Sequence, residues 1–153
     1  MLVGEVEVLG VNLVIVLVYL DTRDTERNGG IYREMDRKMA EIPEGEGRIV
    51  LGDFNGHVGF IGEHDLNRNG QMMLDFMERW NLVMLNADSR CEGKYTRVQG
   101  NERSIIDYAL VDENIYTRFE SMKVDEEKNN YDLSDHCYIE LKETRVKRKD
   151  CGW

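Results

Sequence analysis

The chain has 153 residues, a length that predicts one domain with a core of ordinary size. Its formal charge of −10 and pI near 4.8 argue against passive adhesion to nucleic acid, although bound divalent cations can supply positive charge locally. Three widely spaced cysteines without a Cys-x-x-Cys pair indicate a reducing compartment, so we expect an intracellular protein, nuclear or cytoplasmic. The longest apolar run is too short to span a bilayer, so we expect no membrane partner.

Two apolar stretches near the start of the sequence predict a β-hairpin. Residues 3–8 alternate in polarity, as a half-exposed strand does, and residues 13–20 form an aliphatic run that predicts a strand covered on both faces. Residues 9–12 supply the turn, and the polar residues 21–30, which end in two glycines, predict a loop. An amphipathic helix ended by Pro43 is then predicted by apolar residues at helical spacing: Ile31, Met35, Met39 and Ile42.

The stretch Arg-Ile-Val-Leu-Gly-Asp-Phe-Asn-Gly, residues 48–56, predicts both a strand and a site. Its apolar part indicates a buried strand, and a polar pair follows at the carboxyl end, where α/β folds bind ligands. Side chains two positions apart on an extended chain point the same way. Asp53 and Asn55 can therefore face one site while Phe54 enters the core. The same residues also fit a strand that simply ends in an Asx turn.

The middle of the chain predicts a second helix between a loop and a short strand. Residues 58–68 have the composition of a loop, and Asn69 is the expected N-cap. Residues 82–85 predict the short strand that follows. The buried face of the helix is predicted from four side chains at helical spacing: Met73, Phe76, Met77 and Trp80.

Strands dominate the remainder of the chain. Residues 95–98 and 104–111 predict a hairpin across the turn residues 99–102. Strands and helices alternate, with strands in the majority, which predicts an α/β sandwich. The other expected elements are a helical turn within 112–119, a strand at 122–124, an acidic loop at 125–132, a strand at 136–141 and a basic tail at 142–153.

Three short motifs occur in a fixed order: Gly-Asp-Phe-Asn at 52–55, Ile-Asp-Tyr at 106–108 and Ser-Asp-His at 134–136. In this order they resemble the endonuclease/exonuclease/phosphatase superfamily, most closely LINE-type retrotransposon endonucleases and craniofacial development protein 2-like proteins. The resemblance implies a DNase I-like sandwich of two β-sheets flanked by helices. It implies that residues 1–141 form the later part of such a domain, with the amino-terminal part missing, and that residues 142–153 form a tail.

Phosphodiester hydrolysis needs a cation at the phosphate, an activated water and a stabilised leaving oxygen, and the motif residues suit these needs. Asp135 is a candidate ligand for Mg²⁺ or Mn²⁺, because hard cations prefer carboxylate oxygen. His136 can bind the phosphate or move protons if Asp107 orients its ring; a lone carboxylate in that apolar strand would be costly to bury. Asp53 can orient or deprotonate the attacking water, and Asn55 can donate hydrogen bonds to a phosphate oxygen.

The resemblance implies the same roles for these five residues and adds Tyr19, at the position of an active-site tyrosine that contacts phosphate. An ordinary strand tyrosine is the alternative interpretation of Tyr19. A complete domain of this superfamily carries its principal metal-binding glutamate further upstream, and that role is transferred neither to Glu5 nor to Glu7. We therefore expect a weak metal site and an apolar sheet face or edge that is left uncovered and favours self-association.

Structural interpretations of the same residues stay open. Asp107 and His136 could form a structural hydrogen-bonded pair, and Ser134 with Asp135 could cap a turn. A Ser-His-Asp hydrolase is disfavoured, because consecutive residues on a strand cannot converge as a triad.

Two further groups of residues are candidate binding sites. A zinc site at His57 and His64 would need more ligands at suitable spacing. The basic residues of the tail either contact a phosphate backbone or are simply solvated. These residues are Lys142, Arg145, Lys147, Arg148 and Lys149.

Three functions fit these observations. The first is metal-dependent phosphodiester hydrolysis by a DNA endonuclease of the retrotransposon type, with nucleic acid as the partner. The second is a non-catalytic remnant that keeps the fold and binds a partner. The third is a phosphatase of a small phosphorylated substrate, because substrate choice depends on the loops over the site.

Overall fold

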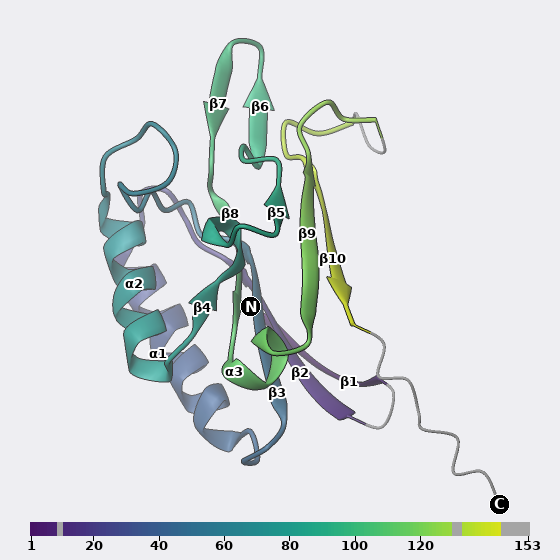
Figure 1. Ribbon diagram of the computed structural model, residues 1–153. Helices are drawn as coiled ribbons and strands as arrows, with labels where there is room; N and C mark the ends of the chain where they lie inside the picture. Colours follow the sequence, from purple (N-terminus) through teal and green to yellow (C-terminus); the bar gives the residue numbers. More distant parts are fainter. Residues whose placement is uncertain (9–10, 130–132, 145–153) are drawn as a thin grey trace, which may run out of the picture.

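The computed structural model describes residues 1–8, 11–129 and 133–144, which form two β-sheets packed face to face (Figure 1). The larger sheet has five strands in the order β1-β2-β3-β8-β4. Strands β2 and β3 run parallel, and the other neighbouring pairs run antiparallel. Its strands are β1 (Leu2–Val8), β2 (Val11–Tyr19), β3 (Gly47–Asp53), β4 (Val83–Met84) and β8 (Asp107–Val111).

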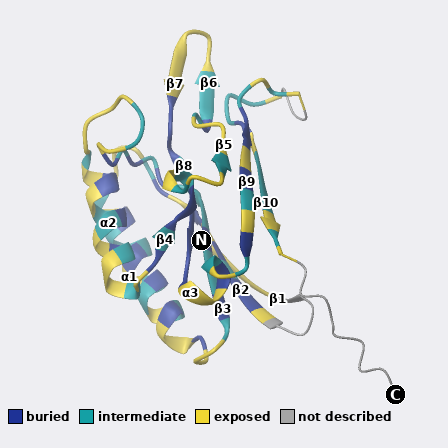
Figure 2. Cartoon of the chain, in the orientation of Figure 1, coloured by how far each residue is buried: buried dark blue, intermediate teal, exposed yellow. Residues whose placement is uncertain are grey.

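Two helices, α1 (Thr25–Glu41) and α2 (Arg68–Trp80), cover one face of the five-stranded sheet (Figure 1). Their inward stripes are dark blue in Figure 2, and they pack on the alternate side chains of β2 that point the same way. The predicted helical faces are confirmed, because burial of these apolar stripes is what holds an amphipathic helix on a sheet. The fully buried members are Met35, Met39, Met73 and Phe76.

The opposite face of the large sheet packs against a three-stranded sheet in the order β10-β9-β5. The second core lies between these sheets and includes Ala109, Val111 and Met122. A 3-10 turn (Leu85–Ala87) and α3 (Glu113–Tyr116) connect the layers. The strands of the smaller sheet are β5 (Cys91–Glu92), β9 (Phe119–Asp125) and β10 (Tyr138–Glu143).

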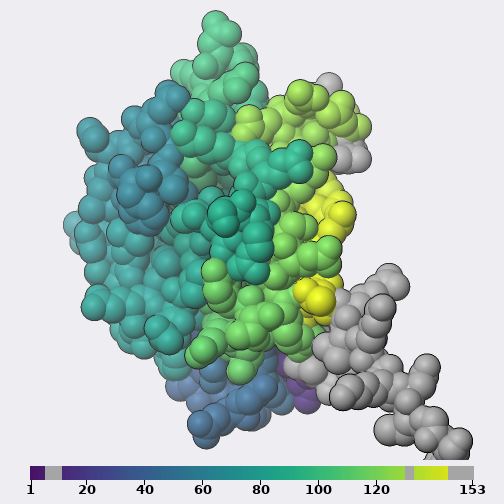
Figure 3. All heavy atoms as spheres, viewed as in Figure 1, coloured from purple at the N-terminus to yellow at the C-terminus, as the bar shows by residue number. Residues whose placement is uncertain are grey.

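A two-stranded hairpin, β6 (Arg97–Gln99) and β7 (Glu102–Ser104), extends beyond both sheets. The space-filling view shows it as the protrusion at one end of the molecule (Figure 3). The sequence predicts a hairpin here but wrongly continues its second strand to residue 111. The chain instead leaves the hairpin after Ser104 and enters the large sheet at Asp107. Thr96 supports this break, because its Oγ1 accepts the backbone N–H groups of Ile106 and Asp107.

The starts of both helices differ from their predictions. The predicted loop at 21–30 is too long, because α1 begins at Thr25, where the side chain of Asp24 accepts the N–H of Arg27. The helix therefore contains both glycines that suggested a loop. The N-cap of α2 is Asn67 rather than Asn69, since Asn67 accepts the N–H of Gly70. Asn69 is instead a buried residue in the first turn.

Several strand limits also differ. Val11 and Asn12, expected in a turn, already belong to β2, and the strand expected at 82–85 is only Val83–Met84. Strand β9 is longer than 122–124, β5 was not predicted, and β10 lies two residues later than 136–141 and enters the predicted tail. The rest of that tail, residues 145–153, lies outside the described residues, as do residues 9, 10 and 130–132.

The face of β1 and β2 that points away from the helices is partly open, as the sequence predicts. Leu2 and Leu17 are cross-strand partners on this face, and they are 71% and 44% exposed. Strand β1 also forms one edge of the sheet. Self-association through this surface stays a prediction. Among the described helices, none is long and apolar enough to cross a membrane.

Candidate active site

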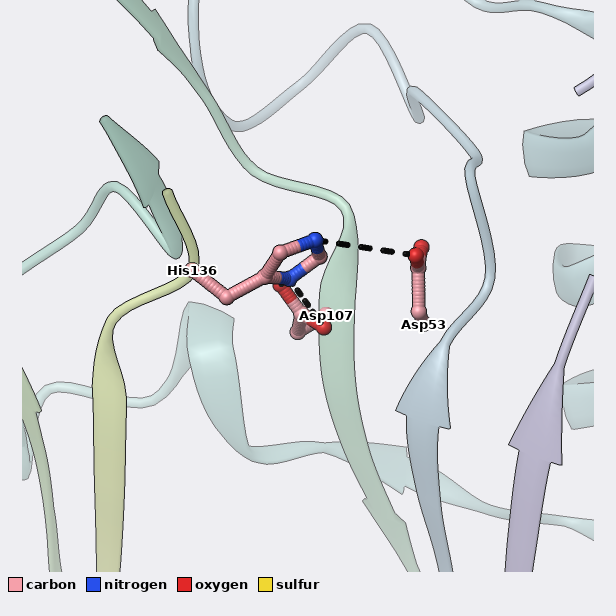
Figure 4. Close-up of side chains that lie close together, drawn as sticks. All are labelled: Asp53, Asp107 and His136. Carbon is pink, nitrogen blue, oxygen red and sulfur yellow. Dashed lines mark hydrogen bonds and ion pairs between the residues drawn. The ribbon is translucent and has the colours of Figure 1, made fainter. Parts of the chain in front are cut away.

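The three motifs of the sequence meet where β3 ends and β8 begins, as Figure 4 shows for Asp53, Asp107 and His136. Asp53 ends β3, Asp107 begins β8, and the antiparallel register makes them direct cross-strand partners, so that their side chains share a face. His136 precedes β10 and forms an isolated bridge with Arg97. The predicted convergence of these three residues is therefore observed.

Asp107 orients the imidazole ring of His136. Nδ1 of His136 lies 2.9 Å and 3.1 Å from the two carboxylate oxygens of Asp107. Nε2 points to the other side, 3.9 Å from Oδ2 of Asp53 (Figure 4). A carboxylate that accepts the Nδ1 proton leaves Nε2 available to the site, which is the arrangement of an oriented proton carrier.

The two aspartates are held in an unfavourable electrostatic setting. Burial raises the pKa of the Asp53 carboxyl, and the nearby Asp107 carboxylate raises it further. Burial also raises the pKa of Asp107, while the His136 partner lowers it. Within the described chain, neither carboxylate has a lysine or arginine partner. Perturbed carboxyl groups of this kind cluster at functional sites.

Asp53 also closes an Asx turn, which confirms the structural interpretation of the motif. Oδ1 of Asp53 accepts the N–H of Asn55 at 2.9 Å, and Asn55 has a left-handed φ of 44°. Nδ2 of Asn55 donates to the carbonyl of Leu20 at 2.7 Å. Phe54 is fully buried, as predicted. The turn thus fixes the backbone on which both polar residues stand.

A hydrogen-bond network of two buried asparagines, Asn28 and Asn69, supports this turn. Asn28 Nδ2 donates to the carbonyl of Asp21 and to Oδ1 of Asn69. Asn69 Nδ2 in turn donates to the carbonyls of Asp21 and Asn55. The sequence does not predict this network, because its members lie up to 48 residues apart and carry no shared motif. It connects both helices to the loops of the site.

Asp53 opens into a cavity of about 890 Å³. Asp53, Asn55 and His136 line it, and so does Tyr19, which is 58% exposed at the end of β2. Asp107 lies behind His136. The further lining residues that the sequence analysis did not assign to the site are Thr22, Glu63, Arg97, Glu102, Arg103, Ser104 and Ile106.

The carboxylate of Asp135 is not a member of the group that Asp53, Asp107 and His136 form. Its Oδ2 accepts a hydrogen bond from Nε of Arg97 at 2.7 Å, and this guanidinium holds the pKa of the Asp135 carboxyl below its usual range. The assignment of Asp135 as a metal ligand stays a prediction. Ser134 caps the local turn, since its Oγ accepts the N–H of His136 at 3.1 Å.

The residues present fit a divalent cation. Asp53, Asp107 and His136 form the one group of three within the described residues whose possible ligand atoms all lie within 4.8 Å of one another. Carboxylate oxygens without a cationic side chain beside them are the ligands that Mg²⁺ and Mn²⁺ prefer. His57 and His64 do not form such a group; their rings stack at 4.4 Å on the cavity wall. The zinc interpretation therefore gains no support.

Comparisons with known proteins found matches to a family model and to solved structures. Residues 13–140 match the family model described as endonuclease-reverse transcriptase. Among solved structures, the endonuclease domain of TRAS1, a telomere-specific non-LTR retrotransposon, aligns with a TM-score of 0.75 and 17% identity. That alignment covers 93% of this chain and 60% of the TRAS1 chain. A comparison with curated protein sequences gave no match.

Two further solved structures share the fold, and both are of proteins named as phosphatases. The 3′ phosphatase NExo from Neisseria, bound to product DNA hairpin, has a TM-score of 0.69 and 18% identity over 94% of this chain and 65% of its own. A mannosyl-6-phosphatase from Bacteroides thetaiotaomicron has a TM-score of 0.60 and 16% identity over 88% and 52%. The chain thus spans less than two thirds of the length of these relatives.

Proposed function

Because the chain belongs to the endonuclease-reverse transcriptase family, within the endonuclease/exonuclease/phosphatase superfamily and its DNase I-like fold, we propose that it hydrolyses phosphodiester bonds of DNA. The proposed activity is that of a retrotransposon-type endonuclease that uses Mg²⁺ or Mn²⁺ inside the cell. The observation that carries the proposal is the Asp53, His136 and Asp107 arrangement at the mouth of a polar cavity.

The geometry supports a division of labour between the two aspartates. Asp107 accepts the Nδ1 proton of His136 and so directs Nε2 toward the side of the ring where Asp53 lies. Asp53, whose pKa is raised, is a stronger base than an ordinary carboxylate. The 3.9 Å between Nε2 and Asp53 Oδ2 brings a proton donor and a proton acceptor to one location.

In the proposed reaction, a water oxygen forms the new bond to phosphorus while its proton passes to Asp53. The bond between phosphorus and the leaving oxygen breaks, and that oxygen takes a proton from Nε2 of His136, which reacts as the imidazolium with its Nδ1 proton donated to Asp107. The proton taken up by Asp53 then returns to Nε2, which lies 3.9 Å from Oδ2 of Asp53. In the proposed reaction Asn55 and Tyr19, which line the same cavity, contact phosphate oxygens, and Asn55 does so through the Nδ2 proton that is not donated to the carbonyl of Leu20. A divalent cation held by the carboxylates of Asp53 and Asp107 would neutralise phosphate charge.

The direct test is nicking of supercoiled plasmid with Mg²⁺ or Mn²⁺. Wild type is expected to convert it to the open circle, and both Asp53→Ala and His136→Ala are expected to lose at least about 10²-fold in rate. Asp75→Asn is the matched control, because Asp75 is an exposed aspartate of α2 that contacts Gln71. Nicking that persists in both site variants would refute the assignment.

A phosphatase of a small phosphorylated substrate is the second candidate. Its supporting observation is the size of the cavity, about 890 Å³, which lies within the usual range for small-molecule sites. Hydrolysis of p-nitrophenyl phosphate without plasmid nicking would favour this candidate. Hydrolysis of neither substrate with either cation would favour the third candidate, a non-catalytic binding module.

A further inference from the structure

Arg97 and Asp135 form an ion pair at the edge of the candidate site. Nε of Arg97 donates to Oδ2 of Asp135 at 2.7 Å, and a second guanidinium nitrogen, Nη2, contacts Oε1 of Gln99. The backbone reinforces the pair, since the N–H of Val98 donates to the carbonyl of Asp135 at 2.8 Å. The guanidinium is therefore held beside the carboxylate by its own strand.

This ion pair lies next to the convergent residues. Arg97 forms a backbone bridge with His136, and its side chain lines the same cavity as Asp53. Asp135 is adjacent in sequence to His136, which pairs with the half-buried carboxylates of Asp53 and Asp107. The sequence assigns Asp135 to the metal site, yet in the structure its carboxylate is bound by a cationic side chain of the protein itself.

A cation at Asp135 would meet competition. One carboxylate oxygen already accepts from the guanidinium, and a second positive charge within a few ångströms of Arg97 is repelled by it. The competition is modest, because the two side chains are 28% and 38% exposed and such pairs are weak. A divalent cation can therefore displace Arg97 from Asp135 at a small cost in free energy.

We propose that Arg97 is a built-in counter-ion of Asp135, which a divalent cation has to displace in order to bind there, so that Arg97 weakens and thereby sets the metal affinity of the site. The proposal rests on the proposed function for its divalent cation, and it adds Asp135 to the carboxylates that hold that cation. Arg97 is a positioning residue in this scheme: it binds Asp135 in the metal-free protein and is released when the cation binds.

The test is calorimetric titration of Mn²⁺ into the full chain without DNA, which separates metal binding from catalysis. Arg97→Ala frees Asp135, and we expect Mn²⁺ to bind about fivefold more tightly than in wild type, as for the loss of a partly exposed ion pair. Arg97→Gln is the second variant; its amide keeps an N–H donor but carries no charge, and we expect the same gain in Mn²⁺ affinity as in Arg97→Ala.

Arg103→Ala is the matched control. Arg103 lines the same cavity and carries the same charge, but it pairs with Glu126 at 3.8 Å instead of Asp135. Its loss tests the effect of general charge removal, and we expect a change in Mn²⁺ affinity of no more than about twofold. Thermal denaturation followed by circular dichroism identifies any variant that is not folded.

Asp135→Asn completes the test. If Arg97 competes for Asp135, this substitution weakens Mn²⁺ binding about fivefold more in the Arg97→Ala background than in wild type. Equal effects in both backgrounds, equal gains in Arg97→Ala and Arg103→Ala, or no Mn²⁺ binding by any variant would each overturn the proposal. Plasmid nicking, measured separately, decides the proposed function.

Discussion

Replacing Asp53 by asparagine should abolish hydrolysis and stabilise the fold at neutral pH. An asparagine Oδ1 can still accept the N–H of Asn55, so the Asx turn that Asp53 closes is retained. What is lost is a charge that sits beside Asp107 in a half-buried place where burial raises its pKa. The substitution therefore separates the catalytic role of Asp53 from its structural role.

The size of the gain follows from the geometry. The possible ligand atoms of Asp53, Asp107 and His136 all lie within 4.8 Å of one another. Two like charges at that separation repel by about 3.5 kcal/mol at an effective dielectric of 20 and by about 0.9 kcal/mol in water. The cavity is open to solvent, and His136 offsets part of the repulsion. We therefore expect Asp53→Asn to raise the free energy of unfolding by about 1–2 kcal/mol, which corresponds to roughly 2–8 °C in Tm.

The pH dependence has a defined sign. A folded-state pKa raised above the ordinary value of 3.8 means that the folded protein binds this proton more tightly than the unfolded chain does. That contribution to stability is present below the unfolded pKa and is lost as pH rises through the folded pKa. The gain in stability of Asp53→Asn over wild type should therefore be absent near pH 3.5 and reach its full size near neutral pH.

Thermal denaturation in EDTA at about pH 3.5 and about pH 7.5, followed by circular dichroism, measures both effects. Asp75→Asn serves as the control on the exposed face of α2. A variant that is less stable than wild type at neutral pH, or that gains the same Tm at both pH values, would show that this electrostatic account of the site is wrong. Added Mn²⁺ should raise the Tm of wild type more than that of the variant.

Three further outcomes are expected. Asp107→Asn should lower the plasmid nicking rate by about 10²–10⁴-fold with the fold intact, because an amide in this place no longer selects the His136 tautomer with its proton on Nδ1; an unchanged rate would argue against that role. Thr96→Val should lower the free energy of unfolding in urea by about 1–3 kcal/mol, since two backbone N–H groups lose their acceptor; a change within error would contradict this. If the chain self-associates through its open sheet face, replacing Leu2 and Leu17 by serine should shift it toward the monomer in size-exclusion chromatography with light scattering, whereas an unchanged oligomer would place the contact elsewhere.

Local signals in the sequence determined the layers of this fold. The stripes at Met35 and Met73 identify two helices, and the aliphatic runs identify the central strands, because burial of apolar surface follows a period that the sequence displays directly. The motif residues Asp53, Asp107 and His136 were likewise identified before their distances were known. A polar side chain inside an apolar run is conspicuous, since it needs a partner.

Helix starts and strand breaks were harder to predict from the sequence, because they depend on competing N-cap residues and on hydrogen-bond acceptors outside the element itself. Asn67 and Asn69 are equally good N-caps by composition, and only the packing of Asn69 against Asn28 decides between them. The strand predicted to continue through Ile106 breaks because Thr96 accepts its N–H from another segment. Such hydrogen bonds join residues that no short window of sequence contains.

The surroundings of the site were decided by tertiary structure alone. The sequence shows Asp135 beside His136 and predicts one site for both, but the β6–β7 hairpin brings Arg97 to Asp135 from 38 residues away. Composition determined the chemistry available to this chain, because ligand preference and proton affinity belong to the residue types. Which carboxylate faces a histidine and which faces a guanidinium depends on strand register and hairpin placement, and these are fixed only when distant segments pack together.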